Sequence, residues 1–148
     1  MHDTIQAQAG TVFRTSVMVR FGDCDPAGIV FYPRYFEMFN NLVEDWCAIG
    51  LGVSFGELIN GRGFGLPTVS IQTDFVAASK LGDLLTAELS VLKLGTASIK
   101  VAIRLIGAEG GDRVRTTLVL VLMDLKKECA ARIPESMRAR ITEFSVEE

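Results

Sequence analysis

The sequence predicts an α+β domain in which an antiparallel sheet packs against one long helix. Three observations support this fold class: one strand and one amphipathic helix come first, four further strands follow, and short turns link those strands. Short turns join antiparallel strands, whereas parallel strands need crossover connections of a dozen or more residues. The 148 residues fit one domain, residues 1–148, with a polar tail over residues 1–11 and a C-terminal helix over residues 134–148.

The first predicted strand covers Val12–Arg20, because apolar and polar residues alternate there. The long helix is predicted to begin near Pro33, since the first turn of a helix tolerates the missing N–H of proline. Apolar residues then recur at helical spacing and form one stripe: Tyr35, Phe36, Phe39, Leu42, Val43, Trp46 and Cys47. Gly50 and Gly52 are predicted to end this helix.

A glycine-rich loop is predicted over residues 50–65, with a short helical piece at Phe55–Ile59. The period then changes to two, which is typical of strands. Four strands are predicted: Leu66–Phe75, Asp83–Lys93, Ser98–Ile106 and Arg113–Asp124. Hairpin turns are predicted at Leu94–Thr96 and Gly107–Asp112.

The apolar content indicates burial between subunits. The chain is 49% hydrophobic, and its mean hydropathy of +0.31 is high for a small soluble protein. The stretch Thr116–Leu125 is too apolar for an exposed strand, and one helix cannot cover a whole sheet. We therefore expect a homo-oligomer in which two such sheets pair.

Charge and cysteine usage argue against several partners. The net charge is −3 and no basic block occurs, so nucleic acid is not an expected partner. The longest apolar run, Leu118–Met123, is far shorter than the ~20 residues of a membrane-spanning helix, so no membrane partner is expected. Three widely spaced cysteines indicate neither a disulfide framework nor a zinc site. With no signal-peptide pattern at the N-terminus, we expect a cytoplasmic protein.

Two acids, Asp23 and Asp25, stand directly before the predicted helix in the stretch "DCDPAG". In an extended chain they would point to the same side, roughly 6.5–7 Å apart. A carboxylate held there could lie beside the free N–H groups of the helix start, which attract an anion or a polarised carbonyl oxygen. Alternatively, one Asp only caps a turn. Both interpretations stay open from the residues alone, although Gly28 would let backbone approach a ligand closely.

Other catalytic classes lack the residues they need. His2 is the only histidine and lies in the predicted tail, so a Ser-His-Asp or Cys-His mechanism has no base. Cys24 has no adjacent His or Lys to activate it, which favours a packing role. The glycines of residues 50–65 form no dinucleotide or nucleoside-triphosphate motif. Acid–base or nucleophilic chemistry would fall to a carboxylate, and no cofactor or metal is expected.

The segment Phe21–Phe39, "FGDCDPAGIVFYPRYFEMF", closely resembles the active-site segment of the hotdog-fold acyl-CoA thioesterases, in particular the 4-hydroxybenzoyl-CoA thioesterase family. The shared pattern is Asp-Pro-Ala-Gly-Ile-Val at residues 25–30, then an aromatic pair, then Pro33-x-Tyr35. The later stretch "GLPTVSIQTDFVAASKLGDLL" is similar to the family's second strand pair, so the resemblance covers most of residues 15–125. It implies the hotdog fold, a curved antiparallel sheet wrapped around one long central helix. It also implies a dimer or a dimer of dimers with active sites at the subunit interface.

By position, the resemblance implies a role for each site residue. Asp25 matches the catalytic carboxylate, a nucleophile or general base, and the backbone N–H of Tyr32 matches the donor that polarises the thioester carbonyl. Asn40 stands where the family has a carboxylate that binds a phenol hydroxyl. Five positions are expected to contact substrate, the last from the neighbouring subunit: Pro26, Gly28, Phe31, Asn40 and Gly65. Where the family has a basic cluster for the CoA phosphates, this chain has only Lys93 and Lys100, so the phosphates could be held loosely, or by other residues such as Arg62 or Lys80.

The resemblance implies hydrolysis of an acyl-CoA, with an aromatic, hydroxybenzoyl-like acyl group, to the free acid and CoA. The acyl group could instead be held by a carrier protein. A second alternative is a non-catalytic hotdog module that binds an acyl thioester or a partner protein, but such a module has no need for a free carboxylate at Asp25. Hotdog dehydratases need a His-bearing motif, and this chain has Phe31-Tyr32 where related branches place a His.

Overall fold

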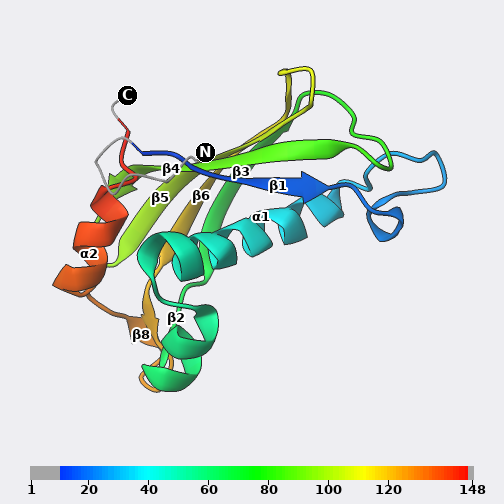
Figure 1. Cartoon of the computed structure of the whole chain (residues 1–148). Coiled ribbons are helices and arrows are strands. Elements are labelled where there is room, and N and C mark those ends of the chain that lie inside the picture. Colours follow the sequence, from blue (N-terminus) through cyan, green and yellow to red (C-terminus); the bar gives the residue numbers. More distant parts are fainter. Residues whose placement is uncertain (1–10, 147–148) are drawn as a thin grey trace.

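The computed structural model describes residues 11–146, in which a curved five-stranded antiparallel sheet holds the helix α1 (Figure 1). The strand order is β1-β4-β5-β6-β3. The strands are β1 (Phe13–Met18), β3 (Thr68–Phe75), β4 (Leu84–Leu94), β5 (Ser98–Ile106) and β6 (Asp112–Val121). The predicted α+β class and both predicted hairpins are confirmed. The predicted tail, apart from Thr11, lies outside the described residues, and so does His2.

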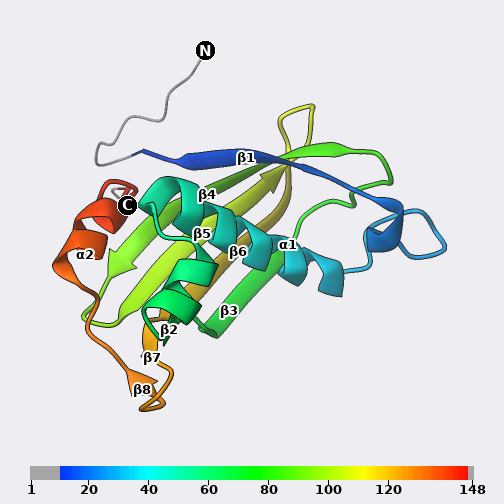
Figure 2. The ribbon, with the colours of Figure 1, turned by 60° about the horizontal axis from the view of Figure 1, so that its bottom comes forward.

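The helix α1 (Pro33–Asp45) lies across the concave face of the sheet (Figure 2) and continues directly into the π-helical turn η2 (Trp46–Leu51). Gly52, at φ 77°, ends it in the left-handed conformation, as predicted. Gly50 does not end the helix. It lies within η2, where a Cβ would come 2.8 Å from Cδ1 of the buried Trp46. Gly50 therefore makes room for the indole ring.

Side chains of the central strands alternate between the two faces of the sheet. Those that face α1 form the buried core of each strand, and they include Leu85, Leu89, Val101, Ile103, Leu118 and Leu120. Burial of one such side chain contributes about 1.5–3 kcal/mol, so this layer is a main source of folding free energy. The opposite face is polar and carries a cross-strand row of charges: Arg14, Glu88, Arg104, Arg115 and Asp74.

The edge strands of the sheet are β1 and β3, and not the more apolar strand β6. The expectation that Thr116–Leu125 needs a second subunit to cover it is wrong for β6, because β6 lies between β5 and β3. On β3, the apolar side chains of Val69, Ile71 and Phe75 are 60%, 41% and 49% exposed. An unpaired edge strand with apolar side chains is a place where another chain can pair.

A second small sheet, in the order β2-β7-β8, is missing from the prediction. Its strands have two residues each, too few to show a period: β2 (Phe64–Gly65), β7 (Met123–Asp124) and β8 (Cys129–Ala130). The predicted helical piece at Phe55–Ile59 is helical in the structure and continues through η3 (Glu57–Gly61), and the predicted C-terminal helix is α2 (Glu135–Thr142). No helix within residues 11–146 is long and apolar enough to cross a membrane.

Candidate active site

The loop between β1 and α1 folds back on itself through Asp23. Phe21–Asp23 form the 3-10 turn η1, and Oδ2 of Asp23 accepts a hydrogen bond from the N–H of Arg20 at 2.8 Å. The carbonyl oxygen of Asp23 accepts from the N–H of Phe31 at 2.9 Å. The extended geometry considered for the two acids is therefore wrong, because the chain turns at Asp23. This residue holds the loop closed.

Asp25 lies at the centre of the loop and is partly exposed. Its N–H donates to the carbonyl oxygen of Ile29 at 2.9 Å, and its own carbonyl oxygen accepts from the N–H of Gly28 at 2.9 Å. Oδ1 accepts from the N–H of Ala27 at 2.9 Å, which makes an Asx turn. Gly28 closes the turn at φ 81°, in the left-handed region. Oδ2 has no hydrogen-bond partner among residues 11–146.

The start of α1 leaves one backbone donor free. Pro33 has no N–H, Arg34 donates to the carbonyl oxygen of Phe31 at 2.8 Å, and Tyr35 donates to that of Tyr32 at 3.1 Å. In the part of the chain that the structure describes, the N–H of Tyr32 has no acceptor. An unpaired N–H at the positive end of a helix attracts a partly negative oxygen.

An aromatic cluster borders the helix start: Phe31, Tyr32, Tyr35, Phe36 and Phe75. The ring of Phe75, on β3, has its centroid 5.9 Å from Tyr32, 5.9 Å from Tyr35 and 6.4 Å from Phe36. Phe31 packs on Tyr32 with centroids 5.6 Å apart. Phe31, Tyr32 and Phe75 remain 50%, 58% and 49% exposed. Such a surface suits a flat apolar group.

The remaining predicted substrate residues divide between the two ends of the sheet. Pro26 is exposed and sits in the same loop as Asp25. Asn40 is exposed on α1, one helical turn after Phe36, and therefore lies on the side of α1 that faces β3. Gly65 is far from this loop: it lies buried in β2, opposite Met123, where a Cβ would come 3.0 Å from Leu125.

The β4–β5 hairpin, which carries two of the three predicted phosphate-binding residues, lies at the end of the sheet away from the loop between β1 and α1 (Figure 1). Lys93 and Lys100 face each other across the β4–β5 hairpin, exposed and without an acidic partner in residues 11–146. Arg62 is paired with Glu57 at 3.0 Å. The loop of Asp25 adjoins the start of β4, and nine residues of β4 separate Leu84 from Lys93, about 30 Å at the usual rise per residue. Within one chain, the structure does not bring these groups to Asp25.

Residues 19–141 match the family model of the thioesterase-like superfamily. The chain belongs to this superfamily. Over 72 residues it is 36% identical to the 4-hydroxybenzoyl-CoA thioesterase of Pseudomonas sp. strain CBS-3, a match that covers 47% of this chain and 50% of that protein. Over 96 residues it is 30% identical to the 1,4-dihydroxy-2-naphthoyl-CoA hydrolase of Thermosynechococcus vestitus, covering 65% and 64%. The chain thus spans half to just under two thirds of the length of these curated relatives.

A solved thioesterase structure confirms the predicted hotdog fold. The crystal structure of a 1,4-dihydroxy-2-naphthoyl-CoA thioesterase from Synechocystis aligns with a TM-score of 0.80, over 88% of this chain and 95% of that one. The two are 24% identical, so this likeness concerns the fold alone.

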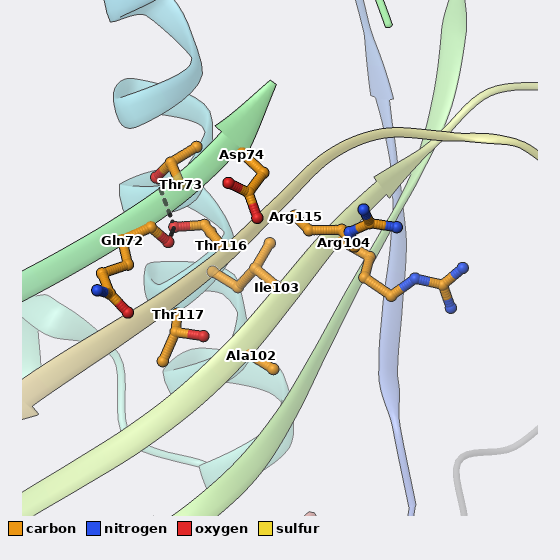
Figure 3. Close-up of a pocket in the computed structure, with 9 residues that line it drawn as sticks. All are labelled: Gln72, Thr73, Asp74, Ala102, Ile103, Arg104, Arg115, Thr116 and Thr117. Atoms are coloured by element: carbon orange, nitrogen blue, oxygen red, sulfur yellow. Dashed lines mark hydrogen bonds between the residues drawn. The ribbon is translucent and has the colours of Figure 1, made fainter. Parts of the chain in front are cut away.

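A hollow of about 700 Å³ on this thioesterase-like domain lies away from Asp25, on the outer face of β3, β5 and β6 (Figure 3). Both arginines that line it, Arg104 and Arg115, are paired with acidic side chains. Asp112 accepts hydrogen bonds from Arg104 at 2.6 Å and from Arg115 at 3.0 Å. These bonds, of which the one from Arg104 has the larger effect, hold the pKa of Asp112 below its ordinary value. Asp25 does not line the hollow, so the candidate active site is the loop and helix start.

Sequence analysis missed Phe75 as a site residue of this superfamily member. In the sequence Phe75 only ends a predicted strand, 43 positions after Tyr32. The signal would have been an aromatic residue on an edge strand, but the edge position of β3 follows from the sheet order and not from local periodicity.

Proposed function

We propose that the protein is an acyl-CoA thioesterase that hydrolyses an aromatic acyl-CoA to the free acid and CoA. The observation that carries this proposal is one loop with two unpartnered groups, Oδ2 of Asp25 and the N–H of Tyr32, among residues 11–146. The superfamily match supports the thioesterase class. The names of the two curated relatives, which specify hydroxybenzoyl-CoA and dihydroxynaphthoyl-CoA, support an aromatic acyl group.

In the proposed mechanism, the N–H of Tyr32 donates to the thioester carbonyl oxygen as that oxygen becomes negative. One such donor is worth about 2.7–4 kcal/mol in the transition state, and the dipole of α1 adds roughly 0.3–1 kcal/mol. Asp25 then acts in one of two ways. Its free oxygen attacks the carbonyl carbon and expels the CoA thiolate, leaving an anhydride that water hydrolyses, or it takes a proton from an attacking water. Either route converts thioester and water into acid and thiol.

The aromatic cluster is proposed to receive the acyl ring. Phe31, Tyr32 and Phe75 present exposed ring faces beside the Tyr32 N–H, and ring pairs add about 0.5–1.5 kcal/mol beyond area burial. Asn40 lies on the same side of α1 and can either donate to or accept from a ring hydroxyl. A hydroxylated aromatic acid therefore fits this surface better than a linear acyl chain.

The complete site is proposed to need two subunits. Two copies that pair their β3 edges antiparallel about a two-fold axis extend the sheet and cover Val69 and Ile71. The Asp25 end of one copy then adjoins the α2 end of the other. The unpaired Lys93 and Lys100 of the partner subunit can bind the CoA phosphates there, and Gly65 of the partner subunit lies at the same end. In this dimer, or in a dimer of two such dimers, groups that are about 30 Å apart within one chain would meet at one site.

The test is a panel of acyl-CoA thioesters followed by release of free thiol, with wild type beside Asp25→Asn. We expect wild type to hydrolyse hydroxylated aromatic acyl-CoA, and kcat of Asp25→Asn to fall by about two to four orders of magnitude with the fold retained. Asp45→Asn, an exposed carboxylate at the C-terminal end of α1, is the control and should keep its kcat. Near-full activity of Asp25→Asn would contradict the role of Asp25. No hydrolysis of any thioester would favour the binding module instead.

A further inference from the structure

One residue of β6, Arg113, binds the segment between β3 and β4, residues 76–83, through both its side chain and its backbone. The end of this segment also pairs with Val19: the N–H of Val19 donates to the carbonyl oxygen of Asp83 at 2.8 Å, and the N–H of Gly82 donates to that of Val19 at 2.9 Å. Nη1 of Arg113 donates to Oδ2 of Asp83 at 2.8 Å, to Oγ of Ser79 at 3.2 Å and to the carbonyl oxygen of Ala78 at 3.2 Å. The backbone carbonyl of Arg113 accepts two further N–H groups from the start of the same segment, at 2.8 and 3.2 Å. We call residues 76–83 the β3–β4 link.

Arg113 has little freedom to move. Its side chain is 14% exposed, whereas the other arginines that form ion pairs within residues 11–146 are 38–68% exposed. Nη2 also pairs with Glu109 at 2.9 Å, but that carboxylate is 60% exposed, and exposed ion pairs contribute little. Ser79 is fully buried, and its hydroxyl has Arg113 as its partner. A charge held this way fixes the position of the groups that it binds.

The β3–β4 link in turn holds the loop of Asp25, residues 20–32. The N–H of Val30 donates to the carbonyl oxygen of Ser79 at 2.9 Å, and the N–H of Leu81 donates to that of Gly28 at 3.0 Å. Ile29 forms an antiparallel bridge with Lys80 between these two bonds. The two segments run side by side at one end of the sheet in both views (Figures 1 and 2).

This contact connects directly to the proposed catalytic groups. Ile29, bridged to the link, accepts the backbone N–H of Asp25, and Val30 is two residues before Tyr32. Within residues 11–146, the other backbone hydrogen bonds of the loop are internal or lead into α1. The link is therefore the hydrogen-bonded support that joins the loop to the sheet.

We infer that Arg113 is a positioning residue for the proposed reaction: it clamps the β3–β4 link, and the link fixes where Asp25 and the N–H of Tyr32 stand. This inference rests on the proposed role of Asp25. Arg113 acts through two layers of hydrogen bonds and is assigned no contact with substrate. Because a misplacement of about 1 Å at reacting groups can cost about 100-fold in rate, loosening the clamp should lower kcat without removing the groups that bind CoA.

The experiment compares Arg113→Met with Glu109→Gln, which removes the other ion pair of the same guanidinium but leaves the link contacts. For Arg113→Met we expect kcat to fall at least tenfold with KM within twofold. Amide hydrogen exchange should rise at least tenfold at Val30 and Leu81 but stay unchanged at Val101 in the sheet. Arg113→Lys keeps the positive charge, but one ammonium cannot span the three acceptors, so this variant should recover only part of the lost kcat. Glu109→Gln should match wild type in both measurements.

If Arg113→Met does not fold, Asp83→Asn tests the same clamp with a side chain of equal size. Unchanged exchange at Val30 and Leu81, or faster exchange throughout the sheet, overturns the inference, since the second result is a general loss of stability. A fall in kcat that Glu109→Gln reproduces also overturns it. Failure of the proposed function is seen separately, as full activity of Asp25→Asn, and leaves the exchange measurement valid.

Discussion

Asp25 uses its two carboxylate oxygens for different purposes. Oδ1 accepts the N–H of Ala27 and fixes the turn, while Oδ2 has no partner within residues 11–146. The two interpretations that the sequence leaves open, a turn cap and a carboxylate presented beside a helix start, are therefore compatible. The hydrogen bond that caps the turn also sets the direction of the free oxygen. In Asp23, by contrast, the side-chain oxygen Oδ2 accepts a hydrogen bond from the N–H of Arg20.

At Tyr32 the backbone, and not the phenol, is expected to matter. Tyr32→Phe should change kcat less than twofold, because it keeps the N–H. Tyr32→Pro removes that donor at φ −53°, an angle that proline adopts, and also removes the ring. Its control is therefore Tyr32→Ala, which loses the ring but keeps the N–H, and kcat of Tyr32→Pro should be about 100- to 1,000-fold below that of Tyr32→Ala. Steady-state kinetics on an aromatic acyl-CoA, with circular dichroism to check the fold, measures all three variants. Equal kcat for Tyr32→Pro and Tyr32→Ala would rule out the donor role.

At the scale of elements, the strands with a long alternating pattern could be predicted from the sequence. β5 spans Ser98–Ile106, as predicted, because buried side chains alternate along it with more exposed ones. The site depended on features without a local period. The turn η1 covers three residues, the strands of the second sheet have two residues each, and the edge position of β3 depends on pairing across the whole sheet. Hence the loop before the helix start, with Asp25 in it, could be located from the sequence, whereas the place of Phe75 beside Tyr32 could not.

The join between α1 and η2 provides a stability prediction. In Gly50→Ala the new Cβ would lie 2.8 Å from Trp46 Cδ1 and 3.0 Å from Phe144 Cζ, and such overpacking costs about 1–3 kcal/mol. Gly56→Ala is the matched control, since the nearest atom to its Cβ is Ser54 Oγ at 3.8 Å and its φ is −59°. Urea unfolding should show a lower midpoint for Gly50→Ala alone. Equal midpoints for both variants would contradict this account of Gly50.

At the scale of the whole molecule, the distribution of charge and exposed apolar surface points beyond one chain. Asp25 and the aromatic cluster lie at one end of the sheet, and the lysine pair of the β4–β5 hairpin lies at the other. Two like charges directly opposite each other destabilise a hairpin, so Lys93 and Lys100 gain from an anionic ligand. The proposed pairing of two copies across their β3 edges would bring the proposed acyl-binding surface of one copy to the proposed phosphate-binding lysines of the other.

Mixed dimers test this arrangement. A Lys93→Glu/Lys100→Glu variant should show a raised KM for acyl-CoA but not for an N-acetylcysteamine thioester of the same acid, which lacks the phosphates. Asp25→Asn should be nearly inactive. In a mixed dimer of the two variants, one site combines an intact Asp25 with intact lysines from the partner subunit. That dimer should therefore regain the wild-type KM with half of the wild-type kcat, because its other site carries both changes.

The alternative arrangement gives the opposite result, which makes the mixed dimer decisive. If Asp25 and the lysines served the same site within one subunit, neither subunit of the mixed dimer would hold an intact set, and KM would stay raised. Ile71→Lys supplies the control for assembly, since a charge on the β3 edge should yield a folded monomer with little activity. Ile49→Lys, on η2 away from β3 and 66% exposed, should remain dimeric and active. Light scattering after gel filtration distinguishes the two states.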